Sequence, residues 1–297
     1  MFKPVPVAGS TSIRILATVY DPGSRTNKNS RENIRKTWAK GHQNNVFFMV
    51  GESCPIIPKQ RKWNRCEVNP KNEPPNPLQL EMYTVAQHDL TEQLKNESMV
   101  VVLPMHDVYQ GLPRKVKEGY AWILENTDAD FILKADDDMY VRVDSFRNFV
   151  NSEFLNKTAK ENGELQTEYH YGGWIRSLKV WTRGKNPEFD YKHSYYPPFA
   201  IGSYGHVVSR PLAQYVVDNK EQLFEYGGED TSLGIWVKES VMNEEHKVKY
   251  HKDVKVMTNG KNCMVNKYHV IGHSLTDFQI KTCYDHADEI EDFPENE

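Results

Sequence analysis

The first half of the chain alternates between short apolar runs and longer amphipathic segments. The apolar runs predict strands because they are short and rich in β-branched residues, whereas the amphipathic segments have the hydrophobic spacing of helices. The predicted strands cover residues 13–20, 46–50, 99–105 and 130–133, and the predicted helices cover residues 29–40, 78–96 and 112–126.

This alternation predicts the fold class. Strands that are apolar almost throughout are typical of parallel strands covered by helices on both faces. We therefore expect an α/β fold with a Rossmann-like, mostly parallel sheet. The second half is less regular, with one clear helix after Arg210, and predicts a continuation of the same domain. The expected organisation is an N-terminal tail (1–11), a single domain (12–284) and an acidic C-terminal tail (285–297).

Local signals refine this outline. Asn29 and Glu32, three residues apart, predict a capping box at the start of the first helix. The segment from Gly51 to about Pro77 is rich in Pro, Asn and Lys and predicts a loop excursion.

Composition excludes several function classes. The 297 residues carry 37 Lys and Arg against 41 Asp and Glu, with no basic run, so nucleic acid is not an expected partner. No stretch is apolar enough to span a bilayer, and the start MFKPVPVAGS lacks the apolar core of a signal peptide. We expect either a soluble protein or one whose anchor lies outside this chain. Dinucleotide, P-loop, HExxH and GxSxG motifs are absent.

The four cysteines allow two disulfides. The sequence-local pairing is Cys54–Cys66 and Cys263–Cys283, and buried free thiols are the open alternative.

The cluster Asp136–Asp138 follows the fourth predicted strand. Ligands of open α/β sheets bind at the carboxyl ends of the strands. Adjacent carboxylates there are best explained by a hard divalent cation, Mn²⁺ or Mg²⁺, that bridges a phosphate-bearing ligand. A surface acidic turn is the alternative.

Further charged residues lie near the same predicted edge. Arg31 and Arg35 share one face of the first helix near its expected N-terminus, where an anion is favoured, although a solvated helix face is the alternative. Asp107 and Lys115 follow the third strand and are candidates for binding a sugar or a phosphate, or for a capped helix start.

Two later segments carry possible catalytic groups. Glu229 and Asp230 lie between Gly-Gly and a helix-like run, which suits a general base, although an N-cap aspartate has the same pattern. His269 and His273 are spaced to share one face of a strand, but a lone histidine is more often structural.

Several motifs in order resemble glycosyltransferase family 31, the β1,3-glycosyltransferases. The resemblance covers about Ile13 to His273 and rests on RENIRKTW, FFMVG, DVYQGLPRK, KADDDMYV, YYPPFAIGSYGHVVS and GGEDTSLGIW. GGWIRSLKVWTRGK, YYPPFAIG and the Cys263–Cys283 segment are similar to the proteoglycan linkage-region β1,3-galactosyltransferase branch. DVYQGLPRK and GGEDTSLGIW are similar to a β1,3-N-acetylgalactosaminyltransferase branch.

The resemblance implies a GT-A fold and an inverting, metal-dependent transfer from a UDP-sugar to a glycan or glycoprotein acceptor in the Golgi lumen. Galactose is the expected sugar, with N-acetylgalactosamine or N-acetylglucosamine as alternatives. Two other classes of function are alternatives. One is a non-catalytic lectin-like or chaperone member of the fold, and the other is a phosphohydrolase.

The resemblance also implies a role for each site residue. Asp230 is expected to be the base, with Glu229 beside it on the catalytic and acceptor side. The expected metal ligands are Asp138, Asp136 and His273. Other expected contacts are Arg31, Arg35, Asp107, Lys115, Lys134, Asp136 and Asp137 to the donor, and Trp174 and Tyr196 to the acceptor. Gly111, Pro113 and His206 depart from the usual family pattern.

Overall fold

The computed structural model describes residues 13–18, 25–62, 65–151, 169–183, 187–242, 247–252, 257–258, 271–272 and 274–287. The two ends of the chain, and so the expected tail boundaries, lie largely outside these ranges.

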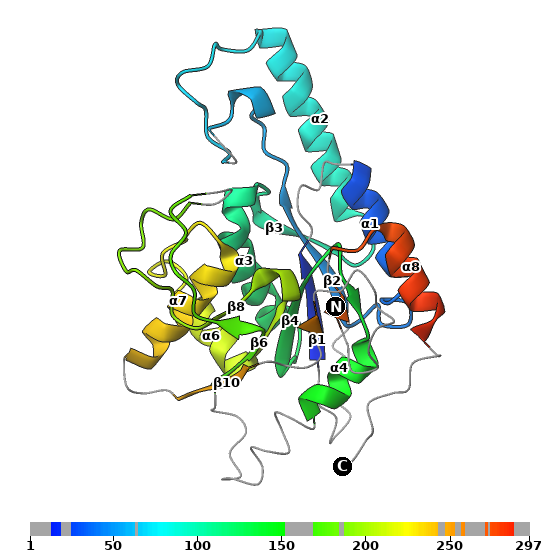
Figure 1. The fold of residues 1–297 in the computed structure, drawn as a ribbon. Helices are drawn as coiled ribbons and strands as arrows, with labels where there is room; N and C mark the ends of the chain where they lie inside the picture. Colours follow the sequence, from blue (N-terminus) through cyan, green and yellow to red (C-terminus); the bar gives the residue numbers. More distant parts are fainter. Residues whose placement is uncertain are drawn as a thin grey trace.

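A seven-stranded sheet forms the centre of the described part of the chain (Figure 1). Its strand order is β10-β6-β9-β4-β1-β2-β3. The strand β9 is antiparallel to both of its neighbours, and the other strands all run in one direction. The strand bounds are β1 Ile13–Thr18, β2 Val46–Glu52, β3 Val100–His106, β4 Phe131–Asp136, β6 Tyr169–Gly173, β9 His206–Ser209 and β10 Val248–Lys252.

Helices cover both faces of the sheet, as Figure 1 shows. On one face lie α1 (Arg25–Lys36), α4 (Val143–Val150) and α8 (Asp277–Asp285), and on the other lie α3 (Leu112–Asn126), α6 (Arg210–Asp218) and α7 (Glu229–Met242). The long helix α2 (Pro77–Lys95) packs beside β3. The expected α/β fold with a mostly parallel sheet, as in a GT-A domain, is therefore confirmed.

The alternation of side chains along β2 separates two apolar cores. Phe48 and Val50 point into the core that contains Ile34 of α1, whereas Met49 points into the core that contains Tyr120 of α3. Strands buried on both faces explain why their sequences are apolar almost throughout.

Helix α1 corrects one sequence prediction. It begins at Arg25 rather than Asn29, so Asn29 lies inside the helix and the expected capping box is wrong. In α2, by contrast, Asn76 is a cap residue whose side chain accepts a 2.9 Å hydrogen bond from the Leu78 backbone N–H.

Smaller elements lie around the edge at which the parallel strands end. One small sheet has the order β11-β12-β5, from Met257–Thr258, Ile271–Gly272 and Tyr140–Val141. Another pairs β7 (Ile175–Arg176) with β8 (Phe199–Ala200). Within the described ranges, the short 3₁₀ turns are η1 (Pro58–Gln60), η2 (Tyr109–Gly111) and η4 (Gly202–Tyr204).

The expected loop excursion between β2 and α2 is confirmed. The disulfide Cys54–Cys66 closes part of it, as the local pairing predicted. Cys283 is also disulfide-bonded, and its predicted partner Cys263 lies outside the described residues. No helix in the described ranges is both long and apolar enough to cross a membrane.

Gly51 allows β2 to approach the end of β3 closely. A Cβ atom at this position would lie 2.6 Å from the Met105 carbonyl oxygen and 2.8 Å from the Asp107 nitrogen. The Gly51 N–H also donates a 2.9 Å hydrogen bond to Asp107 Oδ2. The glycine therefore fixes the position of the segment that follows β3.

We expect Gly51→Ala to lower the free energy of unfolding by about 1–3 kcal/mol, because rigid backbone atoms would have to move. Urea unfolding followed by circular dichroism measures this change. Gly111→Ala is the matched control, since the nearest neighbour of its Cβ would be the flexible Met105 Cε, at 3.0 Å, and the nearest backbone atom, the His106 carbonyl oxygen, would lie at 3.4 Å. Equal stability of the two variants would contradict the argument.

Candidate active site

The three consecutive aspartates lie where the sequence placed them, at the carboxyl end of β4. Asp136 is the last residue of the strand and pairs in register with Thr18 of β1. Asp137 and Asp138 form a turn that is closed by a hydrogen bond from the Met139 N–H to the Asp136 carbonyl oxygen, at 3.2 Å. The turn brings three carboxylates to the edge at which α/β folds bind ligands.

A buried lysine connects this cluster to a second carboxylate segment. Lys134 Nζ lies 2.5 Å from Asp136 Oδ1 and 3.1 Å from Glu229 Oε1, and the residue is only 1% exposed. Burial opposes the charge on Lys134, but the two carboxylates outweigh it and raise the pKa of the ammonium group. Lys134 is therefore held charged between β4 and α7.

Asp137 experiences the repulsion within the cluster. Burial, followed by the charges of Asp136 and Asp138, raises the pKa of Asp137 to about 7. A cation at this edge would relieve that repulsion, and oxygen donors are those preferred by Mg²⁺ and Mn²⁺. The cluster thus fits the expected metal.

The described residues supply only part of a metal-binding set. No group of three His, Cys, Asp or Glu side chains within the described ranges is arranged to hold a metal ion. The described residues on either side of position 273 lie near the aspartate turn. The Leu275 N–H donates a 3.0 Å hydrogen bond to the Asp138 carbonyl oxygen, and Gly272 pairs with Tyr140. His273 itself lies outside the described residues, so its ligand role remains a prediction. Two carboxylates with phosphate oxygens are a usual Mg²⁺ arrangement.

Glu229 and Asp230 form the first turn of α7. Asp230 is 8% exposed, and its carboxylate accepts hydrogen bonds from the Gly202 N–H at 2.9 Å and the Thr231 N–H at 2.8 Å. Burial and then the charge of Glu229 raise the pKa of Asp230 to about 7, although both hydrogen bonds and Lys134 oppose the change. A carboxylate with such a pKa suits a general base near neutral pH.

Two glycines allow the backbone near η4 to approach this network. A Cβ atom on Gly202 would lie 2.7 Å from Glu229 Oε1. Gly205 has a φ of +70°, and its Cβ would lie 2.5 Å from the Lys134 carbonyl oxygen. Sequence reasoning treated this Gly-rich segment only as part of a family motif.

His206, one of the residues that depart from the usual family pattern, lies in the core. His206 is fully buried in β9 opposite Lys134, and its Nε2 lies 2.7 Å from the Tyr120 hydroxyl oxygen. Burial and then Lys134 lower the pKa of His206, so it adds no second positive charge beside Lys134.

Asp107 and Lys115 form an ion pair beside the aspartate cluster. Their charged atoms are 2.5 Å apart, and neither side chain has exposed surface. The alternative of a helix cap does not apply, because α3 begins after Gly111 without a side-chain cap. The pair therefore organises the segment after β3, and direct donor contact stays a prediction.

Arg31 and Arg35 do not lie near the N-terminus of α1, so that part of the prediction is wrong. Both bind Glu97, which precedes β3, through Arg31 Nη2 at 2.8 Å and Arg35 Nη2 at 2.5 Å. This ion-pair cluster precedes β3, and contact between either arginine and the donor stays a prediction. The helix starts earlier than expected, which moves both arginines into its second half.

The two expected acceptor residues differ in exposure. Trp174 is partly buried, lies 4.2 Å from the Tyr204 ring centroid and has the Arg176 guanidinium over its ring. Tyr196 is 2% exposed and packs among Tyr191, Trp181 and Phe199. This burial argues against contact between Tyr196 and an acceptor, because its ring is already enclosed by other rings.

Glu188 holds the segment before the Glu229–Asp230 pair, and the sequence did not predict this role. It is 4% exposed and accepts a 2.7 Å hydrogen bond from the Gly227 N–H, just before Glu229. A single glutamate in a Pro- and Phe-containing loop gives no signal of this role, since its partner is 39 residues away.

Comparisons with known proteins identify the family of the chain. A family model described as Galactosyltransferase matches residues 84–248. A zebrafish protein named UDP-GalNAc:beta-1,3-N-acetylgalactosaminyltransferase 2 is 35% identical over 146 residues, which are 49% of this chain and 28% of that protein. Its human counterpart is 30% identical over 50% of this chain and 29% of its own length. Mouse beta-1,3-galactosyltransferase 6 is 28% identical over 55% of this chain and 48% of its own length.

The matched region spans less than half of each of these relatives. The family model, however, matches more than half of this chain and includes the aspartate cluster, Lys134 and the Glu229–Asp230 pair. The chain therefore belongs to the galactosyltransferase family.

Proposed function

We propose that this protein is an inverting, metal-dependent β1,3-glycosyltransferase that transfers galactose from UDP-Gal to a 3-hydroxyl group of an acceptor glycan. The observation that carries the proposal is the buried Lys134, which binds both Asp136 at the donor edge and Glu229 beside Asp230. One cation thus joins a carboxylate at the donor edge to the carboxylate that precedes the candidate base.

N-acetylgalactosamine is the second candidate sugar. It is favoured by the relatives that are named UDP-GalNAc:beta-1,3-N-acetylgalactosaminyltransferase 2, whose identities of 30–35% exceed the 28% of the named galactosyltransferase. The two donors share the galacto configuration, so both candidates predict rejection of UDP-glucose.

At the donor edge, Asp136 and Asp138 are the described residues that would hold Mn²⁺. The metal, when bound, neutralises charge that develops on the leaving UDP. Lys134 holds Asp136 in position, because its ammonium group is buried against that carboxylate. Asp137 lies between the two ligands and completes the acidic turn.

At the acceptor side, Asp230 acts as the base. It removes the proton of the acceptor 3-hydroxyl as that oxygen attacks the anomeric carbon on the face opposite UDP. The bond from that carbon to the UDP oxygen breaks, and its electron pair leaves with UDP, which inverts the configuration. The two backbone hydrogen bonds orient the carboxylate, and each oxygen keeps a lone pair for the proton.

We also propose that the protein works in the secretory pathway, in the Golgi lumen. The Cys54–Cys66 disulfide supports this location, since disulfides persist in oxidising compartments.

The purified protein, incubated with Mn²⁺ and a panel of acceptor glycosides, should release UDP from UDP-Gal or UDP-GalNAc, and EDTA should abolish the release. Product NMR should show a β1,3 linkage. Phosphate release without acceptor would indicate a phosphohydrolase instead. The absence of turnover with every UDP-sugar would favour a non-catalytic binding protein.

Asp230→Asn should lower the transfer rate by about 10²–10⁴-fold, because the amide cannot accept the proton. The affinity for UDP with Mn²⁺, measured by calorimetry, should stay unchanged. Asp144→Asn is the control, since Asp144 is exposed on α4 and pairs only with Arg147 and His42 among the contacts described. Retained transfer in Asp230→Asn would show that another group is the base.

The pH dependence should follow Asp230. Since the base must be ionised, kcat/KM should be low in acid and reach half of its maximum near the pKa of about 7. Glu229→Gln should move this half-maximum to lower pH, because it removes a charge that raises the Asp230 pKa. Glu239→Gln, on the same helix, should leave it unchanged. A profile that moves to higher pH in Glu229→Gln would contradict the assignment.

A further inference from the structure

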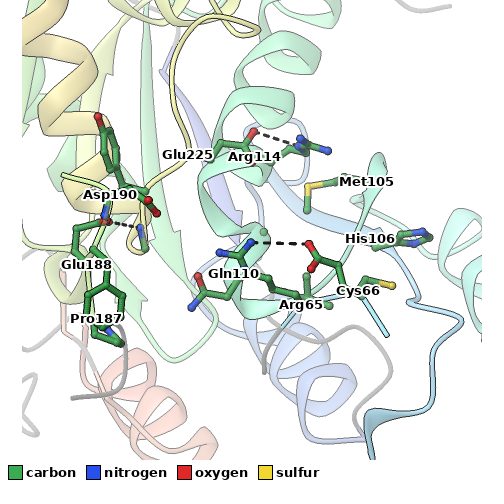
Figure 2. A pocket seen from close by; sticks show the side chains of 16 residues that line it. Arg65, Cys66, Met105, His106, Gln110, Arg114, Pro187, Glu188, Asp190 and Glu225 are labelled. Carbon is green, nitrogen blue, oxygen red and sulfur yellow. Dashed lines mark hydrogen bonds and ion pairs between the residues drawn. The ribbon is translucent and has the colours of Figure 1, made fainter. Parts of the chain in front are cut away.

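A cavity of about 410 Å³ opens beside the Glu229–Asp230 turn. One wall contains Arg65 and Cys66 of the disulfide-closed loop and His106 at the end of β3, and the other contains Pro187–Asp190 (Figure 2). Its volume lies within the range of roughly 300–1,000 Å³ that is usual for small-molecule sites. None of the site residues predicted from the sequence lines it.

Glu188 connects this cavity to the proposed base. Its Oε2 accepts the Gly227 N–H at 2.7 Å, and its Oε1 accepts the Asp190 N–H at 2.8 Å and the Tyr191 N–H at 3.3 Å. Gly227 lines the cavity and precedes Gly228 and Glu229 in the chain. A molecule in the cavity would therefore lie next to a substrate whose hydroxyl group meets Asp230.

The two arginines of the lining each pair with a carboxylate. Arg114 Nε lies 3.1 Å from Glu225 Oε1, and Arg65 Nη1 lies 3.9 Å from Glu67 Oε1. Figure 2 shows the Arg114–Glu225 pair between the two walls. Because each guanidinium already faces a carboxylate, the cavity has no surplus of positive charge for an anion. The Glu188 carboxylate is engaged by backbone N–H groups, and the Asp190 carboxylate is a further hydrogen-bond acceptor in the lining.

Such a lining suits a neutral ligand with many hydroxyl groups. A guanidinium group has five N–H donors and a carboxylate has several acceptor sites, so paired groups still offer hydrogen bonds to hydroxyls that both donate and accept. Phe189 is 62% exposed at the same cavity and offers an apolar ring to the C–H face of a sugar.

We propose that this cavity binds the sugar adjacent to the reacting one in a neutral oligosaccharide acceptor. The proposal rests on the proposed glycosyltransferase function and adds the acceptor class: at least a disaccharide, without sulfate, phosphate or carboxylate at that sugar. The Cys54–Cys66 loop then serves as one wall of the acceptor site.

The test compares monosaccharide and disaccharide acceptors. The probes are methyl β-galactoside and methyl N-acetyl-β-glucosaminide as monosaccharides, and methyl β-lactoside, methyl N-acetyl-β-lactosaminide and methyl β-chitobioside as disaccharides. The wild-type protein should bind at least one disaccharide more tightly than either monosaccharide. Arg114→Gln and Phe189→Ala should each weaken that binding about tenfold, which corresponds to about 1.4 kcal/mol, and leave monosaccharide binding unchanged.

Arg147→Gln is the matched control, because Arg147 is also surface-exposed and paired with a carboxylate, but on α4. Binding is measured by saturation-transfer NMR and calorimetry with UDP and Mn²⁺ present, and the acceptor KM and kcat are measured in parallel. The variants should raise the disaccharide KM and leave kcat unchanged.

Three results would overturn the proposal: no preference for any disaccharide, equal weakening of monosaccharide and disaccharide binding, or tighter binding of 3′-sulfated lactoside or a lysine-rich peptide than of the neutral probes. Because binding is measured without turnover, the two proposals can fail separately. Disaccharide binding that the cavity variants lose, without transfer from any UDP-sugar, would contradict the proposed function and support the cavity assignment.

Discussion

The arrangement of the site depends on one buried cation. Lys134 is enclosed between Asp136, at the end of β4, and Glu229, at the start of α7. Loss of one partner from a buried ion pair costs about 3–5 kcal/mol, because a charge is left uncompensated in the interior. The three groups therefore act as a unit that holds a helix from the second half of the chain against a strand from the first.

Several neighbouring features make this unit possible. The glycines at positions 202 and 205 remove side chains that would clash with Glu229 and with the Lys134 backbone. His206 stays neutral beside Lys134, because burial and then the Lys134 charge lower the pKa of its ring. Asp230 lies next to the unit, in a buried position that raises its pKa toward neutrality. The same packing that stabilises Lys134 thus creates the conditions for a base.

The sequence predicted the features that depend on local pattern. Apolar strands, amphipathic helices and the position of Asp136–Asp138 after β4 follow from the order of residue types. The structure has them close to these places, except that α1 begins four residues earlier. The Cys54–Cys66 disulfide could also be predicted, because the two cysteines are close in the sequence, although free thiols were an equal alternative.

The features that were missed depend on partners far apart in the chain. Arg31 binds Glu97 across 66 residues, and Glu188 binds Gly227 across 39. Tyr196 is enclosed by aromatic rings from several segments. Its position in a Pro-rich stretch of the sequence does not indicate that these rings surround it. Periodicity reports which face of an element is apolar, but it does not report which distant side chain will lie opposite a charge.

The most direct test of the account is a paired measurement on Lys134→Met, after circular dichroism has confirmed that the variant is folded. The Mn²⁺-dependent affinity for UDP and the rate of sugar transfer would be measured on the same preparation. If Lys134 joins the donor edge to the base, both should fall together, since Asp136 and Glu229 lose their shared partner. A variant that loses transfer but keeps its UDP affinity, or keeps both, would contradict the claim that one buried cation organises the two halves of the site.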